Sequence, residues 1–178
     1  MELYQQCTGA AFLDVSKAFD RVWHEGLTYK MRDYAYSGAM TKLISSYLTD
    51  RKFRIRIGPV LSEHGMPEAG VPQGAVLSPL LYSIYTADVP RTPGILISLY
   101  ADDTAIVAKH MNLDKAVRNI QTALDTIEEW SIQWKIAINP DKTQAVIFKK
   151  RRDNPEEQPT LQDRPKEWQN EAKYQSGR

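Results

Sequence analysis

The sequence predicts an α+β protein in which an antiparallel-rich sheet carries helices packed on one face. The main observation is the order of its expected elements, a strand, helices, a strand, a helix, a hairpin, a helix and a second hairpin. Apolar residues repeat every two positions in the short segments and every three or four in the long ones. The 178 residues, 42% hydrophobic and 25% charged, suit one ordinary domain. We expect that domain over residues 1–150 and a polar, flexible tail over residues 151–178.

The first expected strand covers residues 8–16 and is short and apolar. Its period of two places Asp14 on the face opposite Leu13 and Val15, so a carboxylate ends a buried strand. Apolar residues from Phe19 to Tyr34 then recur at helical steps, with Gly26 as the weak point of that helix. A second helix is expected over residues 39–48.

Residues 51–57 alternate basic and apolar side chains, which is typical of a strand with one cationic face. Gly58-Pro59 ends this strand. Residues 78–87 predict a helix, because Pro79 suits a first helical turn.

Two apolar strands are expected at residues 95–100 and 104–108, joined through Ala101-Asp102-Asp103, which puts both aspartates at a hairpin tip. The clearest helical periodicity in the chain covers residues 113–134 and indicates a helix packed on the core. Strands at 135–138 and 144–148 follow, separated by a turn at 139–142.

Composition excludes several classes of function. The net charge is only +1, so a grip on a polyanion must come from local basic patches. No apolar run approaches the ~18 residues of a membrane span, and the start of the chain lacks the pattern of a signal peptide. The single cysteine, Cys7, cannot form an intramolecular disulfide. We therefore expect an intracellular protein without a membrane partner, in the nucleus or the cytoplasm.

The aspartates carry the chemistry that the sequence indicates. Asp14 on a strand end and Asp102 with Asp103 on a hairpin tip can converge although they are distant in sequence, and such carboxylates repel one another without a cation. Mg²⁺ prefers oxygen ligands, and two ions ~3.5 to 4 Å apart can clamp the oxygens of a phosphoryl transfer. Neighbours in a flat strand point to opposite faces, so Asp102 and Asp103 cannot be equivalent ligands without distortion at the turn. Taken alone, the Asp-Asp pair also makes an ordinary turn.

Three separate blocks resemble reverse transcriptases, with the nearest likeness to those of jockey-like, non-LTR retrotransposons. The blocks are Phe12-Leu-Asp-Val-Ser-Lys-Ala-Phe-Asp20, Gly70-Val-Pro-Gln-Gly-Ala-Val-Leu-Ser-Pro79 and Tyr100-Ala-Asp-Asp103. Their order and spacing agree with the family, and the similarity extends from about Thr8 to Lys150. The resemblance implies the palm of a right-hand polymerase, RNA-directed DNA synthesis and dependence on two Mg²⁺ ions, with Mn²⁺ as a substitute.

The resemblance also assigns roles to single residues. Asp14, Asp102 and Asp103 become catalytic metal ligands, with Asp14 on both metals. Phe19 matches the aromatic residue that stacks under the deoxyribose and excludes a 2′-hydroxyl. Gln73 and Gly74 match a segment that lies along the incoming deoxynucleoside triphosphate and the template base. Lys142 matches a basic residue near the triphosphate.

Plainer interpretations of the same residues stay open. Phe19 also fits a helix core, Gln73 with Gly74 an ordinary turn, and Lys142 a solvated turn lysine. The cationic stripe of Arg51, Arg54 and Arg56 either contacts template or primer phosphates or is merely solvated.

The resemblance implies an RNA template and a DNA primer as partners. Only about a dozen residues precede Asp14, so we expect most of the fingers region to be missing from this chain. We likewise expect it to lack the primer-binding hairpin and the thumb, because the tail departs from the family pattern before them. A full-length parent adds these regions and, in many elements, an endonuclease. Two interpretations follow: a truncated polymerase fragment, or a noncatalytic relic that acts as a weak nucleic-acid-binding or interaction module.

Overall fold

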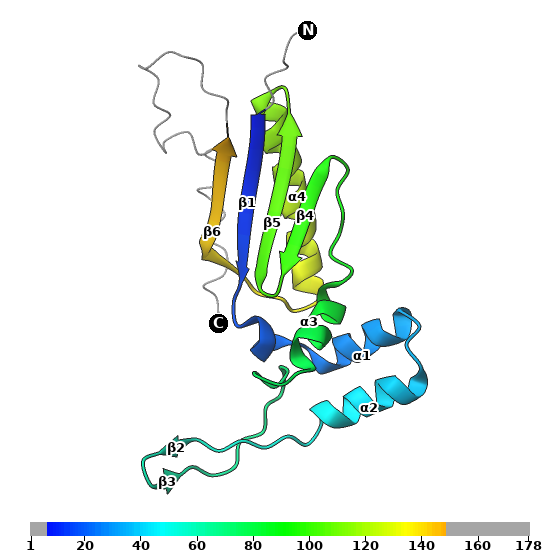
Figure 1. Ribbon diagram of the computed structural model, residues 1–178, viewed down its shortest axis with the longest axis vertical. Coiled ribbons are helices and arrows are strands. Elements are labelled where there is room, and N and C mark those ends of the chain that lie inside the picture. The colour runs from blue at the N-terminus through cyan, green and yellow to red at the C-terminus, as the bar shows by residue number, and fades with distance from the viewer. Residues whose placement is uncertain (1–6, 149–178) are drawn as a thin grey trace. The chain divides into compact units, whose positions relative to one another are not determined.

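The computed structural model describes residues 7–148, which divide into two units of dense internal contact (Figure 1). The sheet unit contains the described residues 7–16, 90–130 and 138–148. The helical unit contains Lys17–Val89 and Ser131–Ala137. The expected tail over residues 151–178 lies outside the described residues. No helix within residues 7–148 is long and apolar enough to cross a bilayer.

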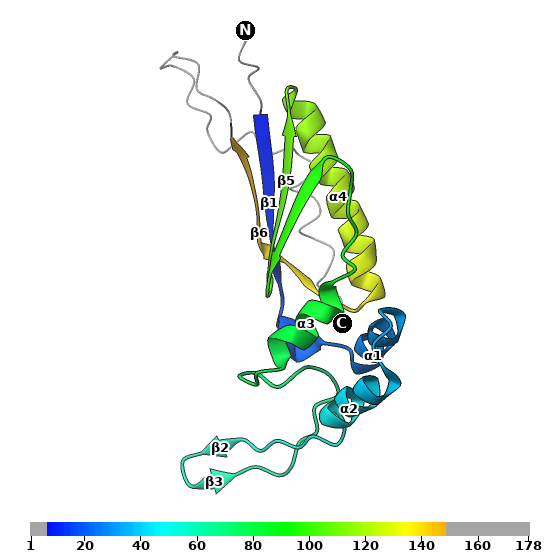
Figure 2. The ribbon, with the colours of Figure 1, turned by 45° about the vertical axis from the view of Figure 1, so that its right-hand side comes forward.

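The sheet unit is built on one four-stranded antiparallel sheet. Its strands are β1 (Cys7–Val15), β4 (Ile95–Tyr100), β5 (Asp103–His110) and β6 (Ile138–Phe148), in the spatial order β4-β5-β1-β6. Helix α4 (Leu113–Gln133) covers one face of this sheet along most of its length (Figure 2). The predicted fold class, an antiparallel sheet with helical cover on one face, is confirmed.

The core of the sheet unit lies between α4 and the strands. In β5, buried Thr104, Ile106 and Ala108 alternate with more exposed residues. In α4, buried residues recur at three- and four-residue steps, at Ala116, Ile120, Ala123 and Ile127. A Cβ atom added to Gly9 of β1 would lie 2.7 Å from the tip of the Ile120 side chain, so the glycine lets that side chain pack close to the strand. Within residues 7–148, no helix of the sheet unit covers the opposite face of the sheet, which we call the open face (Figure 2).

The helical unit contains the 3₁₀ helix η1 (Ala18–Arg21) and the helices α1 (His24–Asp33), α2 (Gly38–Leu48) and α3 (Ser78–Thr86). The predicted continuous helix from Phe19 to Tyr34 is wrong in one respect, because Val22 and Trp23 adopt extended backbone angles between η1 and α1. Gly26 is no weak point: a Cβ atom there would lie 2.5 Å from the Trp23 ring, so the glycine lets that ring pack against α1.

A buried lysine ties the helices of this unit together. Lys30 of α1 is 1% exposed, and its Nζ atom donates to the Tyr85 carbonyl oxygen at 2.6 Å and to Asp88 Oδ1 at 2.5 Å. The same Nζ atom lies 3.8 Å from the centroid of the Trp134 ring. Burial lowers the pKa of Lys30, while the hydrogen bond and the charge of Asp88 oppose that change. Burial also raises the pKa of Tyr85, whose hydroxyl donates to the Trp134 carbonyl, to about 12.

A hairpin arm, which we define as residues 51–66, extends from the helical unit (Figure 1). Its strands β2 (Arg56–Ile57) and β3 (Val60–Leu61) are only two residues long, and an isolated bridge joins Phe53 to Gly65. The predicted strand over residues 51–57 was therefore too long. The predicted end of the strand at Gly58-Pro59 is confirmed, since these residues form the turn of the hairpin.

Candidate active site

Asp14 and Asp103 lie directly opposite each other at one end of the sheet. The antiparallel register of β1 and β5 pairs the two residues, and β4 pairs Tyr100 with Asp103. Directly opposite residues share a face, with Cβ atoms about 4.5 to 5.5 Å apart. Two carboxylates in this position repel each other and favour a bound cation.

The β4–β5 turn presents Asp102 at its tip. Tyr100 and Asp103 close a two-residue loop of Ala101 and Asp102, and both aspartates are exposed. Ala101 has a φ of 52°, which costs a non-glycine residue roughly 1 to 2 kcal/mol. Such strained residues cluster at functional sites. The structure thus places Asp103 in the ladder opposite Asp14, and Asp102 in the strained loop beside it.

Asp14 already has a cationic partner. Its side chain is 19% exposed, and the Lys142 Nζ atom lies 3.5 Å from its Oδ2 atom. Asn139 donates from Nδ2 to the same oxygen at 3.3 Å. The family resemblance predicted that Lys142 lies near the triphosphate, whereas Asn139 was assigned no role. No local sequence pattern pointed to Asn139, because its contact with Asp14 depends on the pairing of β6 with β1.

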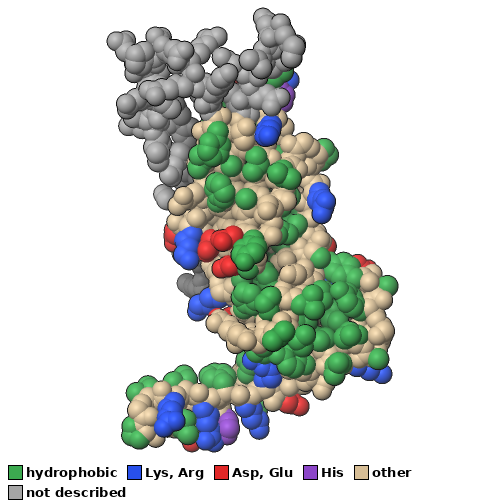
Figure 3. All heavy atoms as spheres, in the orientation of Figure 1, with side chains coloured by type: hydrophobic (Ala, Val, Ile, Leu, Met, Phe, Trp, Pro, Cys, Tyr) green, Lys and Arg blue, Asp and Glu red, His purple; other side chains and the backbone are tan. Residues whose placement is uncertain are grey.

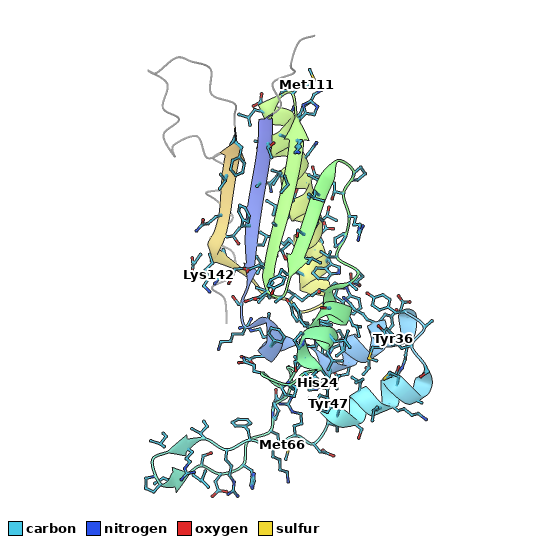
Figure 4. The ribbon with its side chains drawn as sticks, in the orientation of Figure 1. His24, Tyr36, Tyr47, Met66, Met111 and Lys142 are labelled. Carbon is cyan, nitrogen blue, oxygen red and sulfur yellow. The ribbon has the colours of Figure 1, made fainter. Side chains whose placement is uncertain are left out.

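A register shift in β6 brings Lys142 to Asp14. β1 pairs Phe12 with Gln144 but Asp14 with Asn139, so residues 140–143 of β6 form an irregular loop. The loop is closed locally, because Thr143 Oγ1 donates to the Asn139 carbonyl at 2.8 Å and the Asp141 amide donates to Asn139 Oδ1 at 3.2 Å. The turn predicted at 139–142 therefore exists as an irregularity within one strand. Figure 4 labels Lys142 beside the end of β1.

The described residues contain no pre-assembled metal-binding site. Within 7–148, no group of three His, Cys, Asp or Glu side chains is arranged to hold a metal ion. Figure 3 shows acidic side chains gathered on the open face of the sheet. Mg²⁺ in phosphate-handling sites is usually bound by one or two carboxylates together with substrate phosphates, so a pair such as Asp14 and Asp103 suits that chemistry.

The other predicted nucleotide contacts, Phe19, Gln73 and Gly74, lie in the helical unit. Backbone hydrogen bonds hold residues 70–71 against η1: the Val71 amide donates to the Phe19 carbonyl at 2.7 Å and the Gly70 amide to the Val22 carbonyl at 2.9 Å. Gln73 Nε2 donates to Asp20 Oδ1 at 2.8 Å. Phe19 and Gln73 therefore come from segments that are tied together.

Phe19 is half-buried and packs against Tyr82 of α3, with ring centroids 5.2 Å apart. Asp20, the last residue of the first family block, accepts the hydrogen bond from Gln73. His24 makes a hydrogen bond of 2.8 Å from Nε2 to the Gly70 carbonyl. Gly74 has a φ of 80° with open space around it, so its backbone conformation is what requires a glycine.

The fold is similar to that of a solved telomerase. Apo telomerase from Candida tropicalis, truncated from its C-terminal domain, superimposes with a TM-score of 0.61 over 83% of this chain and 32% of that chain, at 16% sequence identity. That likeness concerns the fold alone.

The chain belongs to the reverse transcriptase (RNA-dependent DNA polymerase) family, whose model matches residues 1–175. It is 40% identical over 152 residues to the RNA-directed DNA polymerase from mobile element jockey of Drosophila funebris. It is 39% identical over 142 residues to the probable RNA-directed DNA polymerase from transposon BS of Drosophila melanogaster. These matches cover 81% and 75% of this chain but only 16% of each relative. The predicted resemblance to polymerases of mobile elements is confirmed.

Proposed function

We propose that the chain is the catalytic palm of an RNA-directed DNA polymerase, which extends a DNA primer on an RNA template. The observation that carries this proposal is the pairing of Asp14 with Asp103 at the tip of the Tyr-Ala-Asp-Asp hairpin, in a chain of the reverse transcriptase family. In the reaction, the primer 3′-oxygen bonds to the α-phosphorus of a deoxynucleoside triphosphate, and the bond from that phosphorus to the leaving pyrophosphate breaks.

The donors at this end of the sheet suit Mg²⁺, with Mn²⁺ as a substitute. Asp14 contacts the cationic Lys142 side chain, so its carboxylate already sits where positive charge is favourable. Asp14, Asp102 and Asp103 would hold two ions, and substrate phosphates would complete their ligands. The bound ions would activate the primer hydroxyl and neutralise charge on the pyrophosphate.

Asn139 and Lys142 act on Asp14 in this proposal. The Asn139 amide orients the Asp14 carboxylate through its hydrogen bond. Lys142 neutralises that carboxylate before a cation arrives, and it is 67% exposed on an irregular loop, so it can leave Asp14 without disturbing the core. Once displaced, the ammonium group pairs with the leaving pyrophosphate or protonates it.

Phe19, Gln73 and Gly74 contact the incoming nucleotide. The Phe19 ring, supported by Tyr82, stacks under the deoxyribose and leaves no room for a 2′-hydroxyl. Gly74 presents backbone without a side chain, which allows close approach of a base or sugar. Gln73 is exposed and held by Asp20, so its amide is oriented from within the same unit.

Primer extension tests the proposed activity. The 178-residue chain is incubated with a labelled DNA primer on an RNA template, the four deoxynucleoside triphosphates and Mg²⁺. We expect extension that Asp14→Asn and Asp102→Ala each reduce by more than about a hundredfold, and that Asp114→Asn, an exposed carboxylate at the start of α4, leaves unchanged. Extension that survives Asp102→Ala contradicts the assignment of Asp102. A wild-type chain that extends nothing contradicts the proposed activity of this chain.

Sugar selection tests Phe19 separately. Phe19→Val should raise the use of ribonucleotides relative to deoxyribonucleotides by about tenfold or more, because space opens beside the sugar. The matched control is Phe12→Val, which changes an exposed phenylalanine on the open face of the sheet. If both variants keep wild-type sugar selection, Phe19 is only a packing residue against Tyr82.

A further inference from the structure

The hairpin arm is exposed along almost its whole length and is more basic than the chain. Every residue from 52 to 64 is exposed. Residues 51–66 carry four cationic side chains and one acidic one, a net charge of +3 with His64 neutral, against +1 for the entire chain. A local concentration of positive charge on a chain that is otherwise nearly neutral indicates a surface for a polyanion.

The strand pairing divides the arm into two faces. Ile57 lies opposite Val60, and Arg56 lies opposite Leu61. Phe53 pairs with Gly65 and the Ser62 amide donates to the Ile55 carbonyl, so the pairing continues beyond β2 toward the base of the arm. Because side chains alternate along such an extended segment, Arg54 and Arg56 share one face, while Phe53, Ile55 and Ile57 share the other. We call the first of these the cationic face. Figure 3 shows basic and hydrophobic side chains side by side along the arm.

The structure removes Arg51 from the expected cationic stripe. Its Nη1 atom donates to the Gly70 carbonyl at 3.3 Å, and the residue is only half-exposed, so Arg51 attaches the base of the arm to the segment that precedes Gln73. The remaining basic residues have no acidic partner: within residues 7–148, no salt bridge involves Lys52, Arg54 or Arg56. Their charge is therefore available to a ligand.

Local contacts orient both arginines of the cationic face. A hydrogen bond of 2.6 Å joins Arg54 Nη2 to His64 Nε2, and Arg56 donates from Nε to the Gly58 carbonyl at 3.1 Å. Each guanidinium keeps further N–H groups for a ligand, and such groups match the geometry of phosphate oxygens. Side chains that are already oriented by such hydrogen bonds lose less conformational entropy when a ligand binds than unrestrained side chains do.

The turn of the arm fixes its conformation independently of a hydrophobic core. Gly58 has a φ of 59°, and Pro59 cannot adopt a positive φ, which together select a type II′ turn. That turn matches the twist of paired strands. A cross-strand hydrogen bond from the Ser62 amide to the Ile55 carbonyl, 2.9 Å long, continues the pairing toward the base.

We propose that the cationic face of the arm binds the phosphate backbone of an RNA–DNA hybrid duplex. The proposal rests on the proposed function, in which such a hybrid is both substrate and product. A duplex is favoured over a single strand because it presents one negative charge per about 1.7 Å of helix axis, about twice the charge density of one strand.

Salt dependence of binding tests this proposal without catalysis. The whole chain is titrated against a labelled hybrid in EDTA over roughly 50 to 200 mM salt. Arg54→Gln with Arg56→Gln should lower the slope of log K against log salt by about 1.8, since each lost phosphate contact removes about 0.9. The matched control, Lys115→Gln with Arg118→Gln, removes the same charge from the exposed surface of α4 and should keep the wild-type slope. Arg54→Lys with Arg56→Lys should also keep it.

Several outcomes overturn the proposal. An unchanged salt slope in the variant with Arg54→Gln and Arg56→Gln overturns it. An equal decrease of the slope in the α4 control also overturns it. If single-stranded RNA and DNA lose as much affinity as the hybrid, the duplex assignment is wrong. Association of the chain with itself that depends on Arg54 and Arg56, seen by sedimentation, would identify a protein surface instead.

Primer extension on the same preparations separates this proposal from the proposed function. A chain that binds the hybrid through the arm but extends no primer contradicts the function and leaves the arm assignment standing. A chain that extends primers while the arm variant keeps its salt slope overturns the arm assignment alone.

Discussion

Strand β1 and the hairpin arm are both built from antiparallel pairs, yet they are stabilised in different ways. β1 is nine residues long, lies between β5 and β6, and buries Ala11 and Leu13 beneath α4. The strands of the arm are two residues each, and their apolar residues are exposed, Ile57 at 77% and Val60 at 67%. The position of Asp14 is therefore fixed by a long ladder and a core, whereas the arm depends on turn geometry and a few hydrogen bonds.

This difference matches the two tasks that we propose. Metal ligands must hold a fixed geometry, so carboxylates placed by strand register on a packed sheet are suitable. Contacts with a phosphate backbone need charge more than exact position, so an exposed hairpin is sufficient.

The largest expected effect compares two isoleucines. Ile106→Ala in β5 removes a side chain that is fully buried and should lower the free energy of unfolding by about 3 to 4 kcal/mol. Ile57→Ala in the arm makes the same chemical change on an exposed side chain and should stay within about 0.5 kcal/mol. Urea unfolding of both variants checks the contrast. Equal losses would show that the arm is packed as tightly as the sheet.

The pair formed by buried Lys30 and Asp88 tests how the helices of the helical unit are stabilised. They would resemble the sheet if buried contacts stabilise them, and the arm if only exposed contacts do. Asp88→Asn removes the carboxylate that accepts a hydrogen bond from the buried Lys30 ammonium group and should cost about 2 to 3 kcal/mol. Lys30→Met leaves Asp88, which is 31% exposed and can be hydrated, so it should cost under about 1 kcal/mol. Thermal unfolding distinguishes the two. A larger loss for Lys30→Met would mean that the carboxylate, and not the ammonium, is the poorly solvated partner.

Gly58→Ala should affect the arm alone. An alanine at a φ of 59° costs roughly 1 to 2 kcal/mol, which should speed hydrogen exchange of the Phe53 and Ser62 amides about tenfold. Global stability should change by less than about 0.5 kcal/mol. Gly38→Ala, in the first turn of α2 and with open space around it, provides the matched glycine control. Loss of global stability in Gly58→Ala would show that the arm folds together with the helices.

The smallest expected effect concerns Lys142 at the end of the sheet. Because its ammonium group competes for Asp14 and repels a cation, Lys142→Ala should tighten Mn²⁺ binding by about two- to fivefold in the absence of nucleotide. Electron paramagnetic resonance of free Mn²⁺ measures this affinity. Lys109→Ala removes an equal charge from the exposed side of β5 and should leave the affinity unchanged. Weaker binding by Lys142→Ala would contradict the competition.

Local pattern predicted most of the sheet unit. The alternation around Asp14, the hairpin at residues 95–108 and the helix over residues 113–134 are all present, because burial on one face imposes a clear period on the sequence. The predicted helix from residue 78 also forms, with Pro79 in its first turn.

Features that depend on contacts distant in sequence were missed. Nothing local indicates that Asn139 and Lys142 meet Asp14, since that contact requires β6 to pair with β1 out of regular register. The break between η1 and α1 follows from packing of Trp23 on Gly26, which apolar periodicity cannot distinguish from a continuous helix. Alternation over residues 51–57 predicted a full strand, but without a third strand or a core only its turn-proximal residues pair regularly.

The central claim is that strand register makes Asp14 and Asp103 ligands of a shared ion. Mn²⁺ affinity in wild type, Asp14→Asn, Asp103→Asn and the double variant tests it most directly, with Asp114→Asn as the control. If the two carboxylates hold one ion, the double variant should bind Mn²⁺ only slightly more weakly than the single variant with the lower affinity. The coupling free energy between the two substitutions should then be about 1 kcal/mol or more. The claim would be contradicted if the losses of Mn²⁺ binding free energy in the two single variants simply add in the double variant. An equal loss of affinity in Asp114→Asn would also contradict it.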